Sequence, residues 1–175
     1  MISRQHRSAL MWAVALTFYA ACWFLPIIDS DVGYDGAALA HLLFLDLFED
    51  FASRFEEPAD LFGVVFYATG WMGNELFVLG VFTVRKWPRF AVRSLAFSLG
   101  IMISWQTLYA GAFPFLIGYW LWVAAGVMVL WLSAERLARQ TESSVLSVLT
   151  DKVALALLLF PIFNAAATAA LDATK

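Results

Sequence analysis

The sequence predicts an all-α, polytopic membrane helical bundle, with four to five transmembrane helices and an outer amphipathic interfacial helix. Hydrophobic residues make up 62% of the 175 residues and charged residues 14%, whereas an ordinary soluble domain carries about 25% charged residues. Five apolar stretches come close to the roughly 20 residues that a spanning helix needs. Nearly all basic residues lie before the first stretch or in connections that fall on the same side of the membrane. The length suits a single transmembrane domain over residues 1–175.

The apolar stretches define the expected spans. They cover about residues 9–28, 61–84, 91–113, 116–134 and 153–171. The last span is the least regular, because Pro161 interrupts it and Asn164 lowers its hydropathy. Neighbouring helices can satisfy the backbone groups that a proline frees, so a fifth crossing is expected. The alternative is a helix that lies along the inner membrane surface.

The basic residues predict the orientation. They precede the first span or lie between the second and third or the fourth and fifth spans: Arg4, Arg7, Arg85, Lys86, Arg89, Arg93, Arg136, Arg139 and Lys152. The loop after the first span, 29–60, has Arg54 as its single basic residue. The connection between the third and fourth spans has no charged residue. The positive-inside rule then makes the N-terminus cytoplasmic. We expect the bacterial inner (cytoplasmic) membrane, with Lys175 outside after five crossings or inside after four.

Tryptophans support these boundaries, because aromatic residues gather at both membrane interfaces. Those near predicted inner ends are Trp12, Trp87 and Trp131, and those near outer ends are Trp23, Trp120 and Trp122. Two others, Trp71 and Trp105, lie deep within spans and are expected to pack between helices.

The loop 29–60 is acidic and contains a segment, 37–55, that has the periodicity of an amphipathic helix. Its acidic face gains nothing from anionic headgroups, so capping the bundle or docking on a partner is favoured over plain lipid binding. Before it, Asp29, Asp31 and Asp35 alternate like the oxygen ligands of a calcium loop. The second half of an EF-hand is missing. The competing interpretation is a turn, with Asp35 near the start of the following helix.

The sequence provides no evident cofactor site or catalytic constellation. His6 and His41 both lie outside the spans, so a bis-histidine haem would lack its ligands. The single cysteine, Cys22, excludes an intramolecular disulfide and a cysteine-ligated metal cluster. No phosphate-binding loop, dinucleotide motif or hydrolase motif is present, and no basic stripe indicates nucleic acid. Bound membrane lipid is the expected ligand, besides the calcium ion of the interpretation above.

A polar layer within the spans is the most informative feature. Glu75 and Asn74 interrupt the second apolar stretch, and a charged side chain near the centre of a bilayer costs about 2.5 kcal/mol or more. The polar residues expected at similar depth or on the same side of the second span are Tyr67, Thr17, Ser104 and Asn164. Glu75 is expected to point into the bundle or toward a partner. Its carboxyl group either joins helices by hydrogen bonds or carries a proton or cation, and the first interpretation is favoured.

Glycines on the second span predict a packing seam. Gly63, Gly70, Gly73 and Gly80 share one side of the expected helix, and small residues allow helices to approach closely in lipid.

These features favour a non-enzymatic accessory or assembly subunit of a larger membrane complex. Other membrane subunits or further copies of the chain are the expected partners, together with membrane lipids. The alternative is a small proton- or cation-coupled transporter or channel centred on Glu75. A third hypothesis is a membrane immunity or inhibitor protein.

Overall fold

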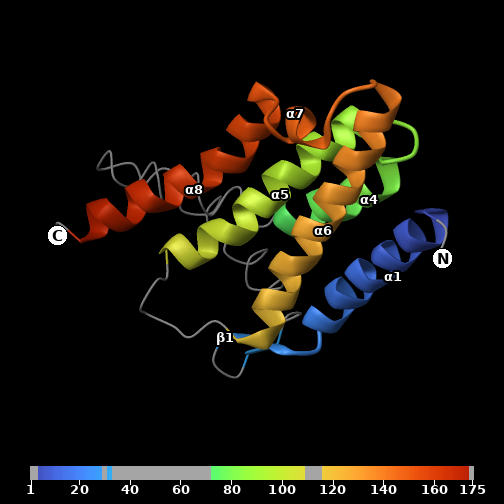
Figure 1. Ribbon diagram of the computed structural model, residues 1–175. Coiled ribbons are helices and arrows are strands. Elements are labelled where there is room, and N and C mark those ends of the chain that lie inside the picture. Colours follow the sequence, from blue (N-terminus) through green and yellow to red (C-terminus); the bar gives the residue numbers. More distant parts are fainter. Residues whose placement is uncertain (1–3, 29–30, 33–71, 109–115, 174–175) are drawn as a thin grey trace.

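A computed structural model describes residues 4–28, 31–32, 72–108 and 116–173 (Figure 1). Six helices lie in this part of the chain: α1 (Arg4–Cys22), α4 (Met72–Thr83), α5 (Pro88–Leu108), α6 (Ile117–Gln140), α7 (Val145–Leu149) and α8 (Lys152–Asp172). Two short strands, β1 (Pro26–Ile28) and β2 (Asp31–Val32), pair antiparallel after α1. The predicted helical fold is confirmed.

Two of the described helices, α6 and α8, are long and apolar enough to cross a membrane by length and composition. The apolar helix α4 has 12 residues, and residues 61–71 of the second expected span lie outside the described part of the chain. The expected amphipathic helix at 37–55 also lies outside it.

The ends of three helices differ from the expected spans. Helix α1 ends at Cys22, and Pro26–Ile28 form β1, so the first span does not continue as a helix to Ile28. Pro26 explains this correction, since proline has no backbone N–H and restricts the residue before it to an extended conformation. Helix α5 begins at Pro88, a position at which proline is favoured. Helix α6 continues to Gln140 beyond the apolar stretch that ends at residue 134.

Helix α5 is the centre of the described bundle. It packs against α8, α4 and α6, while α1 packs along α6 (Figure 1). The hydrophobic core between these helices includes Phe77, Leu95, Met102 and Val129. Helix α8 runs parallel to α5, because Arg93 lies beside Asp151 at its start and Gly100 lies against Leu158 further along.

The expected fifth span, 153–171, is one continuous helix in which Pro161 is buried. Helix α8 therefore has the length of a crossing despite its proline.

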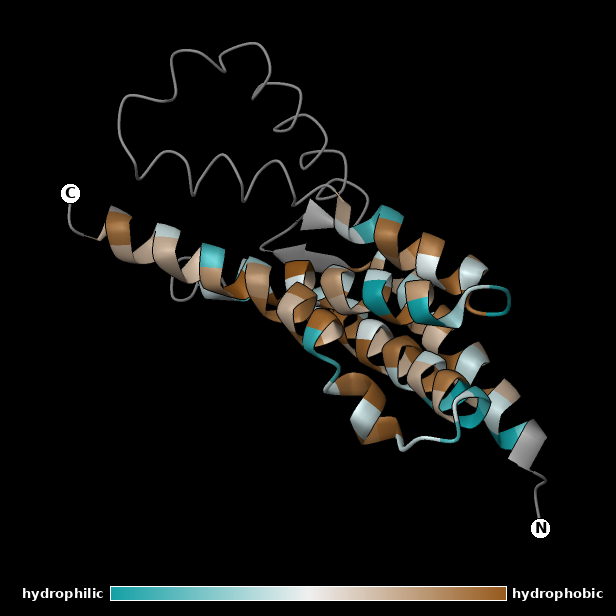
Figure 2. Ribbon diagram, turned by 90° about the horizontal axis from the view of Figure 1, so that it is seen from above, coloured by the Kyte–Doolittle hydropathy of each residue, from teal (hydrophilic) through white to brown (hydrophobic). Residues whose placement is uncertain are grey.

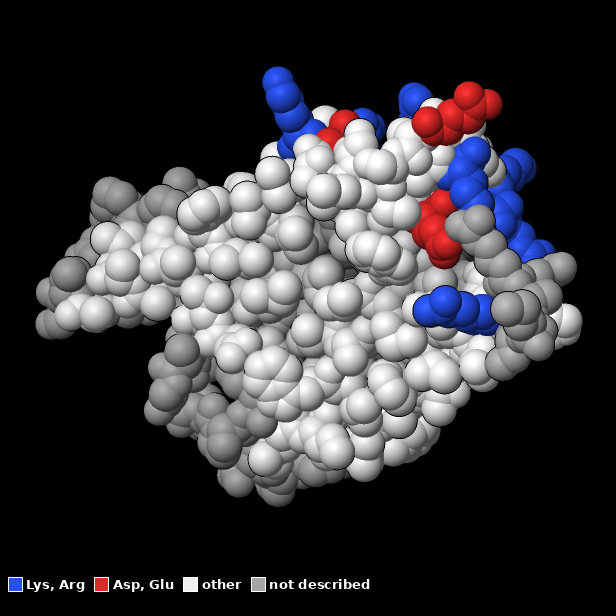
Figure 3. All heavy atoms as spheres, viewed as in Figure 1, with Lys and Arg blue, Asp and Glu red and all other residues white. Residues whose placement is uncertain are grey.

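Charge gathers at one end of the molecule. Figure 3 shows Lys, Arg, Asp and Glu at the end that holds the start of α1, the α4–α5 connection and the α6–α7 connection, while the rest of the visible face is uncharged. In Figure 2 hydrophobic residues predominate along the helices, and hydrophilic residues occur in the connections and at some helical positions. The sides of the bundle expose many large apolar side chains, among them Leu10, Val78, Leu79, Trp120, Val127, Trp131, Leu155, Phe160 and Phe163. Soluble monomers rarely expose extensive apolar patches.

Candidate functional site: an asparagine that joins three helices

Asn74 lies at the point where α1, α4 and α6 meet. Its Oδ1 atom accepts a hydrogen bond from the Tyr19 hydroxyl at 3.3 Å and another from the Trp122 indole N–H at 3.1 Å. The Tyr19 ring also stacks on Phe77 of α4, with ring centroids 4.1 Å apart. A side-chain carbonyl oxygen has two lone pairs, so one asparagine satisfies donors from two other helices.

Two buried hydroxyl groups join the helices around this centre. The Ser98 Oγ atom donates to the Gly73 carbonyl oxygen at 2.6 Å and links α5 to α4. The Tyr119 hydroxyl donates to the Met102 carbonyl oxygen at 2.9 Å and links α6 to α5. Each hydroxyl finds a main-chain acceptor, as a buried polar group needs.

The other residues of the predicted polar layer have different positions. Glu75 is exposed on α4, within electrostatic range of Tyr19. Whether it faces a partner stays a prediction. Thr17 is exposed on α1. Ser104 is buried and donates to Ile101 of its own helix at 2.6 Å.

Two further members of the predicted layer remain. Asn164 is buried on α8, where its main-chain carbonyl oxygen accepts a hydrogen bond from the Thr168 hydroxyl at 3.0 Å. Tyr67 lies outside the described residues.

Sequence reasoning missed Tyr19 and Trp122 as partners of Asn74. Trp122 was expected at the outer interface, but the structure turns it inward and exposes Trp120 instead. Residues two apart on a helix point in nearly opposite directions, since 3.6 residues make a turn. At most one of the two tryptophans can therefore face the surroundings, and this spacing was a signal in the sequence.

Glycines lie where the helices approach most closely. A Cβ atom at Gly80 would lie 2.5 Å from Cγ of Leu95, and one at Gly73 would lie 3.1 Å from Cγ2 of Ile101, so both face α5. Two glycines that were not predicted do the same elsewhere: Gly100 lies against the Leu158 carbonyl of α8, and Gly126 lies against Met102. The predicted Gly63 and Gly70 lie outside the described residues.

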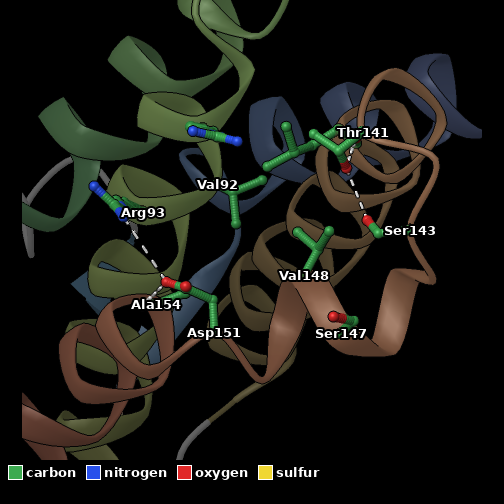
Figure 4. A pocket seen from close by; sticks show the side chains of 10 residues that line it. Val92, Arg93, Thr141, Ser143, Ser147, Val148, Asp151 and Ala154 are labelled. Atoms are coloured by element: carbon green, nitrogen blue, oxygen red, sulfur yellow. Dashed lines mark hydrogen bonds and ion pairs between the residues drawn. The ribbon is translucent and has the colours of Figure 1, made fainter.

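A second polar group lines a cavity of about 370 Å³ at the charged end, between α5, α6, α7 and α8 (Figure 4). Asp151 lies 3.9 Å from Arg93 and accepts hydrogen bonds from the Val153 and Ala154 N–H groups at 3.2 Å, which caps α8. The hydroxyls of Thr141 and Ser143 lie 2.7 Å apart. These contacts fix helix ends, and the half-exposed ion pair contributes little stability.

Within the described ranges, no three His, Cys, Asp or Glu side chains are grouped as metal ligands. Of the expected calcium loop, Asp31 is in β2, while Asp29 and Asp35 lie outside the described residues. The calcium interpretation remains a prediction.

No protein-family model, curated protein or solved structure matches this chain.

Proposed function

We propose that the protein is a membrane bundle of four or five spans that acts as a non-enzymatic accessory or assembly subunit of a larger membrane complex. Its place is the bacterial inner membrane, with the N-terminus in the cytoplasm. The exposed apolar sides of the bundle and the gathering of charge at one end support a membrane location. A basic end of this kind belongs in the cytoplasm.

The observation that carries the subunit role is one face of α4, formed by Glu75, Val78 and Leu79 and called here the α4 stripe. These residues are spaced i, i+3 and i+4 and therefore share a side of the helix, and all three are exposed. Carboxylates within membrane helices almost always face protein or water rather than lipid tails, and Val78 and Leu79 offer exposed apolar surface beside this one. We infer that the α4 stripe contacts a second membrane protein or a second copy of this chain.

Helix α8 supports the fifth crossing. It begins at the charged end and runs parallel to α5, with α5 against one side. If α5 runs outward from the cytoplasm, α8 runs outward too.

The experiment is purification of the tagged full chain in a mild detergent, followed by native mass spectrometry of what co-elutes. Leu79→Ala should lower the co-eluted partner or second copy about tenfold, which corresponds to roughly 1.4 kcal/mol of binding free energy. Leu155→Ala on α8 is the matched control, because Leu155 and Leu79 are exposed to 39% and 42%. Equal behaviour of the two variants, or a wild-type chain that elutes alone, contradicts the proposal.

Glu75→Gln separates the subunit from the transporter. Glutamine keeps the shape and hydrogen-bonding capacity of the side chain but cannot ionise, so assembly and activity should survive in a subunit. An assembled variant that has lost its host phenotype or ion flux would instead identify Glu75 as a proton or cation site.

A further inference from the structure

A hollow of about 880 Å³ opens between α1, α4 and α6 at the charged end of the bundle. Its wall is mainly apolar and includes Trp12, Leu16, Val81, Phe82 and Val84. Three arginines complete the lining: Arg85 in the turn after α4, and Arg136 and Arg139 on the last turns of α6. No acidic residue lines it among the described residues.

The packing of the helices explains why this space exists. Helix α1 packs along α6 and α4 packs along α5, and Tyr19 joins α1 to α4 through Asn74 and Phe77. Ser8, at the other end of the hollow, lies about 16 Å along α1 from Tyr19, at 1.5 Å rise per residue. On α1 the lining extends from Leu16, one turn before Tyr19, to Ser8, so the hollow runs from near the Tyr19 contact toward the charged end.

Arg136 is partly buried in the wall of the hollow. Its Nε atom is buried, and no acceptor in the described part of the chain lies within hydrogen-bonding distance. A buried donor of this kind is costly unless it is paired. Arg139 lies 3.9 Å from Glu135, in a pair whose arginine side chain is nearly half exposed, so its guanidinium still has free donors. Guanidinium groups bind phosphate oxygens with two parallel hydrogen bonds.

We propose that this hollow binds an anionic phospholipid of the cytoplasmic leaflet. The phosphate lies among Arg85, Arg136 and Arg139, and an acyl chain lies along Trp12, Leu16 and Phe82. Phe82 is 80% exposed at the rim of the hollow, where a lipid chain would cover it. Basic pockets between membrane helices on the cytoplasmic side recognise anionic headgroups in this way. The inference rests on the proposed membrane location.

The test is native mass spectrometry of the detergent-purified full chain, titrated with phosphatidylglycerol or with phosphatidylcholine that has the same acyl chains. Phosphatidylglycerol should bind about tenfold more tightly, as expected for recognition of a headgroup charge worth roughly 1.4 kcal/mol. Arg136→Gln and Arg85→Gln should each remove most of this preference. Arg89→Gln is the control. This substitution removes the same charge at the same end of the bundle, but Arg89 is exposed and does not line this hollow.

Equal binding of the two lipids, or an equal loss in all three arginine variants, would overturn the inference. If Arg136→Gln does not fold, the exposed Arg85 still provides the comparison. Inorganic phosphate in excess should leave the lipid bound, and displacement by phosphate would show that the site recognises a free anion. A protein or peptide co-eluting on these arginines in place of lipid would also contradict it.

The same preparations separate the two proposals. If both the subunit role and the lipid site are correct, the Leu79→Ala variant should lose its partner and keep its bound lipid. A chain that is not extracted with membranes overturns both proposals. A membrane-extracted chain with a partner but no preference for phosphatidylglycerol overturns the lipid site alone.

Discussion

Asn74 and Glu75 are adjacent in the chain but serve different sides of α4. Successive residues on a helix point about 100° apart, so one polar side chain can face the bundle while the next faces outward. Asn74 accepts hydrogen bonds from Tyr19 and Trp122, and Glu75 is exposed beside it. This division gives the first residue a role in folding and the second, by our proposal, a role in assembly.

Asn74→Ala should destabilise the bundle by on the order of 1 kcal/mol, since it removes two interhelical hydrogen bonds that average about 0.6 kcal/mol each in membrane proteins. Unfolding in mixed micelles measures the change. Combining it with Trp122→Phe in a double-mutant cycle isolates the Asn74–Trp122 bond, because interacting residues show non-additive effects. Thr17→Ala, at an exposed position, is the control. Strict additivity of Asn74→Ala and Trp122→Phe would show that this bond adds no stability.

The sequence predicted part of this site for a physical reason. A polar pair inside an apolar stretch is visible without a structure, because its burial is costly. Its partners are not visible, since Tyr19 and Trp122 lie 55 and 48 residues away along the chain. Only the packing of α1 and α6 brings them to Asn74. Whether Glu75 is exposed or buried also depends on packing, because the periodicity of the sequence does not say which side of a helix its neighbours cover.

At the scale of the elements, two glycines allow close contacts between helices, one with a main-chain atom and the other with a side chain. At Gly100 a methyl group would meet the Leu158 main-chain carbonyl of α8, whereas at Gly126 its nearest neighbour would be the Met102 sulfur at 2.9 Å. A carbonyl within a helix is fixed, but a methionine side chain is flexible and adapts to altered packing. The two glycines therefore form a matched pair for testing the α5–α8 contact.

Gly100→Ala should destabilise the protein by about 1–3 kcal/mol, the usual cost of overpacking a core. Gly126→Ala should cost less, and both variants share the same helix-propensity gain from alanine, so this gain cancels in the comparison. Mixed-micelle unfolding and limited proteolysis at the start of α8 check the difference. If the two variants are equally stable, the close approach of α5 and α8 is not a constraint.

The ends of the elements were less predictable than their existence. Apolar length located α8 well, because a hydrophobic run and a helix coincide there. Helix α6 extends beyond its apolar run, where charged residues such as Glu135 and Arg139 form an i, i+4 pair. Hydropathy does not reveal such an extension, since a helix can continue beyond its apolar residues without a change of backbone conformation.

At the scale of the whole molecule, the direction of each helix fits one arrangement. The start of α1, the α4–α5 connection, the end of α6 and the start of α8 all lie at the charged end (Figures 1 and 3). Helices α1, α5 and α8 therefore run away from that end, while α4 and α6 run toward it. The described connections α4–α5 and α6–α7 both lie at the charged end, and helices that run in alternate directions between two faces are the arrangement that a membrane protein needs.

The topology is tested with one cysteine placed before α7 and another placed after α8, in a Cys22→Ala background that removes the buried native thiol. Ser143→Cys, in the exposed turn before α7, should react with a membrane-impermeant maleimide only after the cells are permeabilised, because its end carries the basic residues. Ala173→Cys, exposed after α8, should react in intact spheroplasts if α8 crosses outward beside α5. Protection at both sites until permeabilisation would leave four crossings, with α8 along the inner surface. Labelling of Ser143→Cys alone in intact spheroplasts would invert the orientation, and with it the cytoplasmic placement of the arginines that we assign to the lipid.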